Sequence, residues 1–160
     1  MSAEYEPWVE GDSRRIAWRM RDPAPDIPPD DIVELISLKQ LAAVRRRVRA
    51  LLTASLSERG MADPDLVEEV VERSILVIDE LASNAIRHGT APATLDVRDT
   101  GDHWVVVATD AAPHQLPTPA RDRPEGQGGY GLYVIADLAS AHGVEVDGAR
   151  KRVWARLPKY

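Results

Sequence analysis

The sequence predicts a single α+β domain in which helices lie on one face of a mixed β-sheet. The length of 160 residues is that of one domain. Hydrophobic residues make up 44% and charged residues 29% of the chain, which excludes wholesale disorder. Helical and strand patterns do not alternate strictly along the chain. This order disfavours a doubly wound parallel fold and favours a mixed sheet with the helices layered on it.

The composition also excludes several classes of function. The chain has no cysteine, which excludes disulfides, thiolate catalysis and zinc–sulfur sites. Its formal net charge of −6 argues against nonspecific binding to nucleic acid. Apolar runs such as Trp104–Ala108 are far shorter than the ~20 residues of a membrane helix, and the acidic start lacks the apolar core of a signal peptide. We therefore expect a cytoplasmic protein without direct nucleic-acid or membrane contact.

The first thirty residues predict little regular structure. Residues 1–13 are polar and indicate a flexible tail before a domain that spans residues 14–160. The segment Arg14–Met20 alternates polar and apolar residues and predicts an edge strand. The stretch from Asp22 to Asp31 carries four prolines, which forbid a helix and predict a connector.

A first helix is expected from Ser37 to Gly60. Ser37 and Gln40 have the spacing of a capping box, in which each side chain satisfies the other residue's backbone N–H. Apolar residues recur at helical spacing through the segment, and the glycine ends it. The other faces carry Arg45, Arg46, Arg47 and Arg49. These arginines indicate either a solvated face or a docking surface for an acidic partner.

A second helix is expected between Asp63 and Gly89, followed by paired strands. Asp63 is an N-cap residue and is followed by proline at the first helical position. A regular apolar stripe then runs from Val67 to Ala85 and predicts a buried face. Two strands, Thr94–Arg98 and Trp104–Asp110, flank a short turn.

The last third of the chain predicts a loop, a helix and two strands. Ala111–Gln127 contains four prolines and no periodicity, and a loop of this length in a compact domain is typical of a functional lid. A third helix is expected at Gly131–Ala141. Two strands, Val144–Val146 and Arg152–Leu157, close the chain around a turn.

Polar residues at helical spacing near the end of the second helix form the first candidate site. Glu80, Asn84 and His88 are each four residues apart and therefore share one stripe, away from the apolar one. A carboxylate and an amide oxygen together suit Mg²⁺. The alternative is a solvated polar face, and His88 is expected to pack at the helix end.

A glycine-rich segment that opens the third helix forms the second candidate site. Its sequence is Gly126-Gln-Gly128-Gly129-Tyr-Gly131-Leu132. Glycines allow close backbone approach to an anion, and the free N–H groups of a helix N-terminus attract phosphate. The segment matches neither a P-loop nor a dinucleotide-binding fingerprint. The alternative is a flexible loop before a helix.

Together the two segments resemble those of a known family. Glu80-Leu-Ala-Ser-Asn84-Ala-Ile-Arg-His88-Gly89 is similar to the asparagine box of the GHKL ATPases, and Gly126–Leu132 to their second glycine box. Asp110 sits where that superfamily has its adenine-reading aspartate. Within the superfamily, residues 14–158 resemble the small anti-sigma-factor serine kinases of bacteria. The resemblance implies a two-layer α/β sandwich of the Bergerat type, with three helices on one face of the sheet.

The resemblance also implies cofactors and residue roles. ATP and Mg²⁺ would be bound, with Asn84 supplying an oxygen to the metal and Asp110 accepting a hydrogen bond from the adenine amino group. Glu80, with an ordinary pKa of ~4.3, would accept the proton of the attacking serine hydroxyl. Gly126, Gly128, Gly129, Gly131 and Leu132 would form the phosphate-binding segment.

The implied partners are a sigma factor and an anti-anti-sigma protein with a STAS fold, and a homodimer is possible. Two departures from the family pattern favour a second hypothesis, a binding module that transfers nothing. The first glycine box has Ala112 where glycine is typical, and Arg152 stands where relatives have threonine, although it could reach a phosphate. A detached histidine-kinase domain is disfavoured, because the first helix lacks a phosphoacceptor histidine.

Overall fold

A computed structural model describes residues 23–115 and 130–160 of the chain, with side chains described from residue 134 onward in the second range. The expected tail 1–13, the expected strand Arg14–Met20 and the glycines Gly126, Gly128 and Gly129 lie outside the described residues. The division into a tail and one domain therefore stays a prediction.

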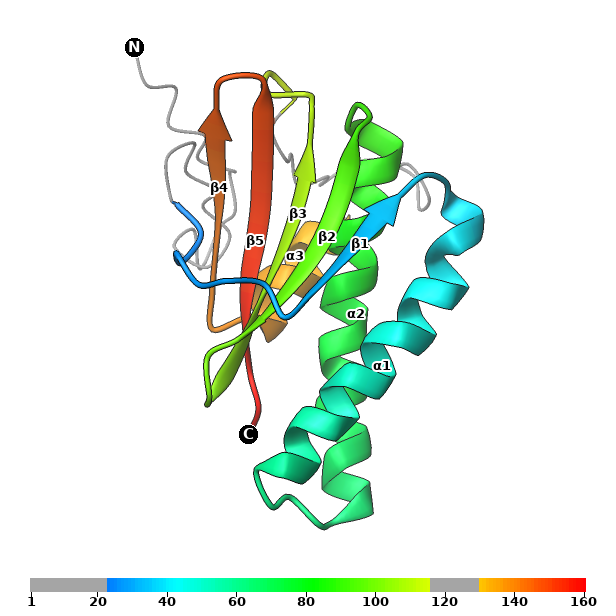
Figure 1. The fold of residues 1–160 in the computed structure, drawn as a ribbon, viewed down its shortest axis with the longest axis vertical. Coiled ribbons are helices and arrows are strands. Elements are labelled where there is room, and N and C mark those ends of the chain that lie inside the picture. Colours follow the sequence, from blue (N-terminus) through cyan, green and yellow to red (C-terminus); the bar gives the residue numbers. More distant parts are fainter. Residues whose placement is uncertain (1–22, 116–129) are drawn as a thin grey trace.

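The described residues form three α-helices and five strands, with a short 3-10 turn before the first helix. In chain order these elements are β1 Asp31–Leu35, η1 Leu38–Gln40, α1 Leu41–Glu58, α2 Pro64–His88, β2 Ala93–Asp99, β3 His103–Asp110, α3 Tyr130–Leu138, β4 Ala141–Asp147 and β5 Arg150–Pro158. The sheet order is β1-β2-β3-β5-β4, and the helices cover one of its faces (Figure 1). The α+β class is confirmed.

The sheet is antiparallel at all four pairings of the described strands, so the expectation of a mixed sheet is wrong. The connections explain this result. Between β1 and β2 the chain runs through two helices, α1 and α2, which return it to the end of the sheet that it left. Tight turns join β2 to β3 and β4 to β5. A single helix, α3, connects β3 to β4, so these two strands run in the same direction. They do not pair with each other, because β5 lies between them.

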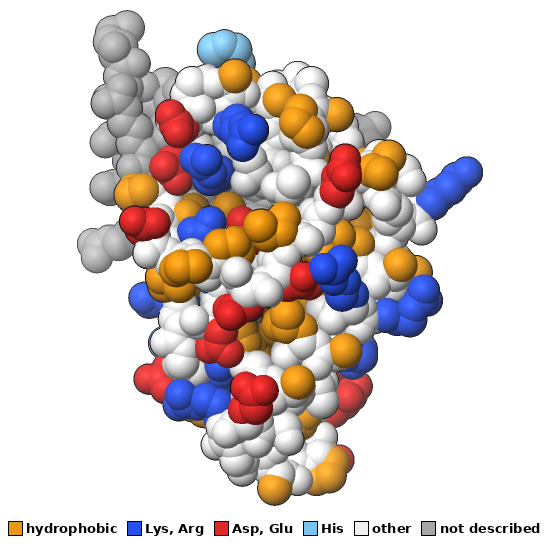
Figure 2. All heavy atoms as spheres, viewed as in Figure 1, with side chains coloured by type: hydrophobic (Ala, Val, Ile, Leu, Met, Phe, Trp, Pro, Cys, Tyr) orange, Lys and Arg blue, Asp and Glu red, His pale blue; other side chains and the backbone are white. Residues whose placement is uncertain are grey.

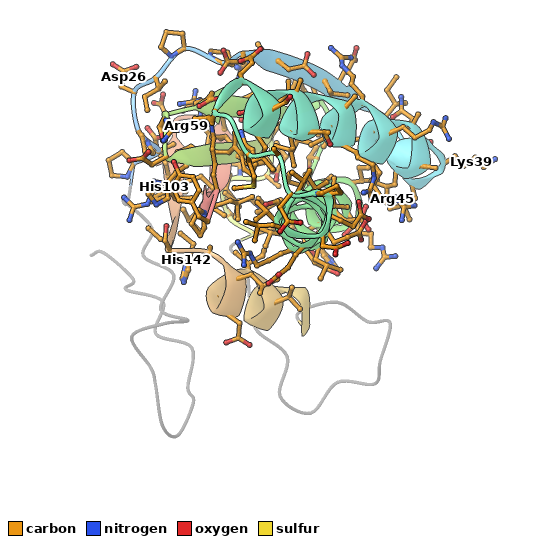
Figure 3. All side chains as sticks on the ribbon, turned by 90° about the horizontal axis from the view of Figure 1, so that it is seen from below. Asp26, Lys39, Arg45, Arg59, His103 and His142 are labelled. Atoms are coloured by element: carbon orange, nitrogen blue, oxygen red, sulfur yellow. The ribbon has the colours of Figure 1, made fainter. Side chains whose placement is uncertain are left out.

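Helix α2 is the central element of the helical layer. It packs on β1, β2, β3 and β5, with α1 on one side and α3 on the other, as the view along α2 in Figure 3 shows. Its predicted apolar stripe is confirmed, since Val71, Ile78 and Leu81 are each 1% exposed. Asp63 caps its first turn, with Oδ1 accepting from the backbone N–H of Asp65 at 3.0 Å.

Helix α1 begins after the predicted cap, and its arginines are largely paired. The expected capping box is present, and its Gln40 side chain accepts from the backbone N–H of Ser37 at 3.1 Å. Arg45 lies 3.7 Å from Asp79 of α2, and the guanidinium groups of Arg47 and Arg49 pair with carboxylates of β1 and α2. Basic and acidic side chains are intermixed over the face seen in Figure 2. The pairing favours the solvated face over a docking surface.

The strand β1 was not expected from the sequence, which predicted a proline-rich connector ending at its first residue. The described part of that connector, residues 23–30, crosses the outer face of the sheet, away from the helices (Figure 1). Arg98 of β2 donates to the carbonyl of Pro25 at 2.6 Å, and Ala24 packs against Val105, Val107 and Trp154. Proline density therefore marked the crossing segment correctly, and the five-residue strand directly after it was missed.

A buried polar cluster ties the end of β5 to α1 and to the start of β3. The ammonium of Lys159, which is 1% exposed, donates to Ser55 Oγ at 2.8 Å and to Asp99 Oδ1 at 2.7 Å. It also lies 5.2 Å from the ring centre of Trp104. Because β3 runs from His103 to Asp110, this cluster lies at the opposite end of the strand from Asp110.

Candidate functional site

Helix α2 positions two of the predicted site residues near its C-terminal end. Glu80 and Asn84 are one turn apart and both half-buried, while Ala82 and Ala85 between and beside them face the core. His88 is exposed, so the expectation that it packs at the helix end is wrong. The structure thus keeps Glu80 and Asn84 on a partly sheltered stripe and leaves His88 in solvent.

The environment of Glu80 makes it a stronger base than an ordinary glutamate. Burial raises the pKa of Glu80, and the neighbouring carboxylate of Asp79 raises it further, while the charge of Arg87 partly opposes both effects. The expectation of an ordinary pKa is therefore corrected upward. A carboxylate with a raised pKa binds a proton more readily, which is the property required of a general base.

Asp110, the third predicted site residue, ends β3 and is 2% exposed. Its Oδ1 accepts from the backbone N–H of Ala112 at 2.8 Å. Its carboxylate also lies against Gly89, the residue that ends α2, at a point where an added Cβ would lie 2.6 Å from Asp110 Cγ. The backbone N–H of Ala111 donates to the carbonyl of Thr90 at 2.8 Å. These contacts join the end of the asparagine-box helix to the end of β3.

Ala112 does not strain the turn that follows β3. Among the described residues, no residue other than glycine has a positive φ, so Ala112 fits here without the left-handed conformation that glycine adopts easily. Its side chain is buried, at 7% exposed, and its N–H closes the turn onto Asp110. Alanine at this position is therefore compatible with the turn, and its N–H holds the Asp110 carboxylate in place.

Lys151 of β5 is a site residue that the sequence reasoning missed. It is the register partner of Asp110 across β3 and β5, it is 4% exposed, and its Nζ lies 3.4 Å from Asp110 Oδ2. Its ammonium also donates to the carbonyl of Gln115. The signal that could have found it is the alternation of faces along β5, which puts Lys151 on the helix side together with Val153 and Leu157.

The same alternation corrects the expectation for Arg152. Its side chain pairs with Glu145 at 3.8 Å and with Asp147 at 3.7 Å. Both partners belong to β4 and, like Arg152 and Trp154, lie on the outer face of the sheet, because successive strand residues point to opposite faces. Arg152 therefore faces away from Asp110, and it cannot replace a threonine contact at the site or reach a phosphate there.

The segment predicted to bind phosphate, residues 126–132, is described only at its end. Gly131 and Leu132 lie in the first turn of α3, as the prediction of a helix start required, and α3 packs against α2. Gly126, Gly128 and Gly129 lie outside the described residues, so their role stays a prediction. The expected lid Ala111–Gln127 is described only as far as Gln115, whose carbonyl Lys151 holds.

The described residues are compatible with a metal ion that takes most of its ligands from a bound nucleotide and water and few from the protein. Within residues 23–115 and 130–160 there is no group of three or more His, Asp or Glu that could hold a metal ion. Mg²⁺ commonly takes one or two protein oxygens and fills its other positions with phosphate oxygens and water. The half-buried amide of Asn84 can supply one such oxygen.

An antiparallel five-stranded sheet under three helices, with a helix-borne asparagine and an aspartate at the end of a central strand, defines an ATPase domain of the GHKL type. Residues 37–157 match the profile of the histidine kinase-like ATPase domain, and the chain belongs to this family. Nucleotide use and a kinase-like class follow from that membership.

Other comparisons add less. The chain is similar to the histidine kinase AdeS of Acinetobacter baumannii, with 18% identity, a TM-score of 0.40, and coverage of 76% of this chain and 81% of that one. No curated protein matches the sequence. In the part of the chain that the structure describes, every helix is too short or too polar to cross a bilayer.

Proposed function

We propose that this protein is an ATP-dependent protein-serine kinase that regulates transcription by binding protein partners. The observation that carries the proposal is the pairing of two half-buried residues on α2, Glu80 and Asn84, with a buried Asp110 held against the end of the same helix. Family membership supports nucleotide binding. Glu80 supports transfer, because a binding module has no need of a partly buried carboxylate with a raised pKa.

In this proposal each residue has one chemical task. Asp110 accepts a hydrogen bond from the adenine amino group and so fixes the base. Asn84 holds Mg²⁺, which when bound neutralises phosphate charge. Glu80 accepts the proton of the partner's serine hydroxyl as the serine oxygen forms its bond to the γ-phosphorus and the bond from that phosphorus to ADP breaks. Such transfer depends mainly on positioning and charge neutralisation, so a short set of residues suffices.

The proposed partners are a sigma factor and an anti-anti-sigma protein with a STAS fold, in a partner-switching cycle inside the cytoplasm. The support is the resemblance of residues 14–158 to anti-sigma-factor serine kinases. A homodimer is the proposed assembly. The negative net charge of −6 fits regulation through proteins in preference to direct contact with DNA.

The test is a pull-down with the tagged chain, followed by incubation of the captured proteins with labelled ATP and Mg²⁺. The proposal expects a sigma factor and a STAS protein among the captured proteins, and label on a serine of the STAS protein. Capture of both proteins with no label on either, under conditions where the chain binds ATP, would contradict the kinase proposal.

A second candidate function, a partner-binding module that transfers no phosphoryl group, is favoured by one observation. Both carboxylate oxygens of Asp110 already have partners in the chain, Ala112 and Lys151, so this aspartate could serve a structural role. The module would bind its partners equally well with Glu80 replaced by glutamine, and label would never appear on a partner. The labelled-ATP experiment separates the two candidates.

A further inference from the structure

A buried ion pair joins Lys151 to Asp110, the predicted site residue at the end of β3. Lysine is seldom fully buried, because its ammonium loses hydration that a single partner rarely replaces. Here Lys151 is 4% exposed and Asp110 is 2% exposed, on the face of the sheet that α2 covers. Neighbouring inward positions on the same two strands, Ala108 and Val153, are apolar. A lysine at this position therefore points to a role in the site.

The Lys151 ammonium has two contacts in the site, one to the Asp110 carboxylate and one to the backbone beyond β3. The Lys151 ammonium lies 3.4 Å from Asp110 Oδ2, the oxygen that also faces Gly89. The same ammonium donates to the carbonyl of Gln115, five residues beyond Asp110. Lys151 thus links the carboxylate to the chain that leaves β3. The other carboxylate oxygen, Oδ1, is fixed by the Ala112 N–H at 2.8 Å.

We propose that Lys151 is a positioning residue that holds the Asp110 carboxylate in the orientation of a hydrogen-bond acceptor for the base, and that this pair makes the site selective for a 6-amino purine. This inference rests on the proposed function, in which Asp110 contacts the base.

The selectivity follows from the chemistry of the carboxyl group. An ionised carboxylate only accepts hydrogen bonds, whereas a protonated one can also donate. The 6-amino group of adenine is a donor and matches the ionised form. The 6-keto group of hypoxanthine is an acceptor and cannot form a hydrogen bond to a carboxylate. Without the Lys151 ammonium, Asp110 Oδ2 loses the contact that fixes its direction, so the hydrogen bond to the 6-amino group weakens. Loss of the Lys151 side chain should therefore weaken the binding of ATP more than the binding of ITP.

The experiment compares Lys151→Met with Arg152→Met, a matched control that removes a positive charge from the next residue on the opposite face of β5. Calorimetric titration of each full-length variant with ATP and with ITP gives the dissociation constants. We expect Lys151→Met to weaken ATP by about tenfold or more, the usual worth of a hydrogen bond to a charged group, and to narrow the preference for ATP over ITP. Arg152→Met should leave both constants within about twofold of the wild type. Lys151→Arg should restore part of the ATP preference, since it keeps the charge.

Lys151→Met alone leaves a buried carboxylate without its partner, which can destabilise the fold. A double variant controls for this effect. Asp110→Asn combined with Lys151→Met removes both charges, which is far less costly than removing one. If Lys151 acts through Asp110, adding Lys151→Met to Asp110→Asn should change the ATP constant by less than about twofold, so the two effects are not additive. Independent tenfold losses in the two backgrounds would overturn the inference.

The outcomes separate the inference from the function on which it rests. A wild-type chain that binds neither ATP nor ITP overturns the proposed function and this inference with it. A wild-type chain that binds ATP, together with a folded Lys151→Met variant of unchanged ATP affinity and unchanged base preference, overturns the inference alone.

Discussion

The backbone of Gly89 and the carboxylate of Asp110 are in contact where the end of α2 meets the end of β3. A Cβ on Gly89 would lie 2.6 Å from Asp110 Cγ and 2.3 Å from the carbonyl oxygen of Ala85. The second obstacle is backbone and cannot move aside. The glycine that ends the asparagine-box helix therefore does more than end it, because its missing side chain makes room for the residue proposed to contact adenine.

The variant Gly89→Ala should consequently lose both stability and nucleotide affinity. We expect a loss of about 1–3 kcal/mol in the free energy of unfolding, the usual cost of overpacking, because the new methyl group displaces the Asp110 carboxylate or the last turn of α2. Chemical denaturation measures the stability, and titration with ATP measures the affinity. The control is Gly148→Ala in the turn between β4 and β5, where no atom lies within 4 Å of the added Cβ and only the positive φ of 58° opposes the change. It should lose stability without losing affinity; an equal loss of affinity in both variants would disprove the link between Gly89 and the site.

Glu80→Gln should separate catalysis from stability. Removing the base is expected to lower serine phosphorylation by roughly 10²–10⁴-fold while ATP affinity and partner binding stay within a few-fold. Because the folded-state pKa of Glu80 lies above its unfolded value, its ionised form opposes folding at neutral pH. The glutamine variant should therefore be as stable as the wild type at pH 7, or slightly more stable. Thermal melts and single-turnover transfer assays give the two quantities, with the exposed Glu69→Gln on the same helix as the control.

The same shift predicts a pH profile for the wild type. Transfer should rise with pH through the raised pKa of Glu80, because only the ionised carboxylate accepts the serine proton. Stability should move in the opposite direction over the window between the unfolded and folded pKa values, and both trends should be absent from Glu80→Gln. If Glu80→Gln keeps the wild-type pH dependence of transfer and stability, the titrating group is not Glu80.

The Lys159 cluster should affect stability alone, since it lies at the opposite end of β3 from Asp110. Burial alone would raise the pKa of Asp99, but hydrogen bonds from Lys159, the Gly101 N–H and Ser55 outweigh it and lower the pKa below its usual range. That stabilisation is present above the ordinary aspartate pKa and is lost as the pH falls through the lowered one. Lys159→Met should cost about 2 kcal/mol or more at pH 7, reduce this loss of stability in acid, and leave the ATP constant unchanged. Denaturation curves at pH 7 and pH 3, with an ATP titration, test all three points.

Local signals in the sequence predicted the elements that depend on neighbouring residues. The Asp63–Pro64 start of α2, its buried stripe and its end at Gly89 follow from capping and helical periodicity, and the structure confirms them. β1 escaped prediction because five residues directly after a proline-rich stretch give too short a pattern. The antiparallel pairing was missed because strand order is set by the two-helix connection and by the insertion of β5, which no local pattern records.

Some residues of the candidate site were likewise predicted from the sequence, and one was missed. Glu80 and Asn84 were predicted from helical spacing, and Asp110 from the resemblance to the family. The structure places the first two on one helical stripe and the third at the end of that helix. Lys151 was overlooked in favour of Arg152, because the resemblance aligned residue types without regard to faces. A shift of one residue on a strand reverses the face, and the register places Lys151, and not Arg152, opposite Asp110.

The most direct test of the account is titration of the wild-type chain and two variants with ATP and with ADP, each with and without Mg²⁺. We expect Mg²⁺-dependent ATP binding by the wild type. Asn84→Ala should lose mainly the Mg²⁺-dependent part of that affinity, because it removes the proposed metal ligand. Asp110→Asn should weaken ATP and ADP alike, because it changes the contact to the base. No binding by the wild type at millimolar ATP, or binding that neither variant alters, would contradict the assignment of this site.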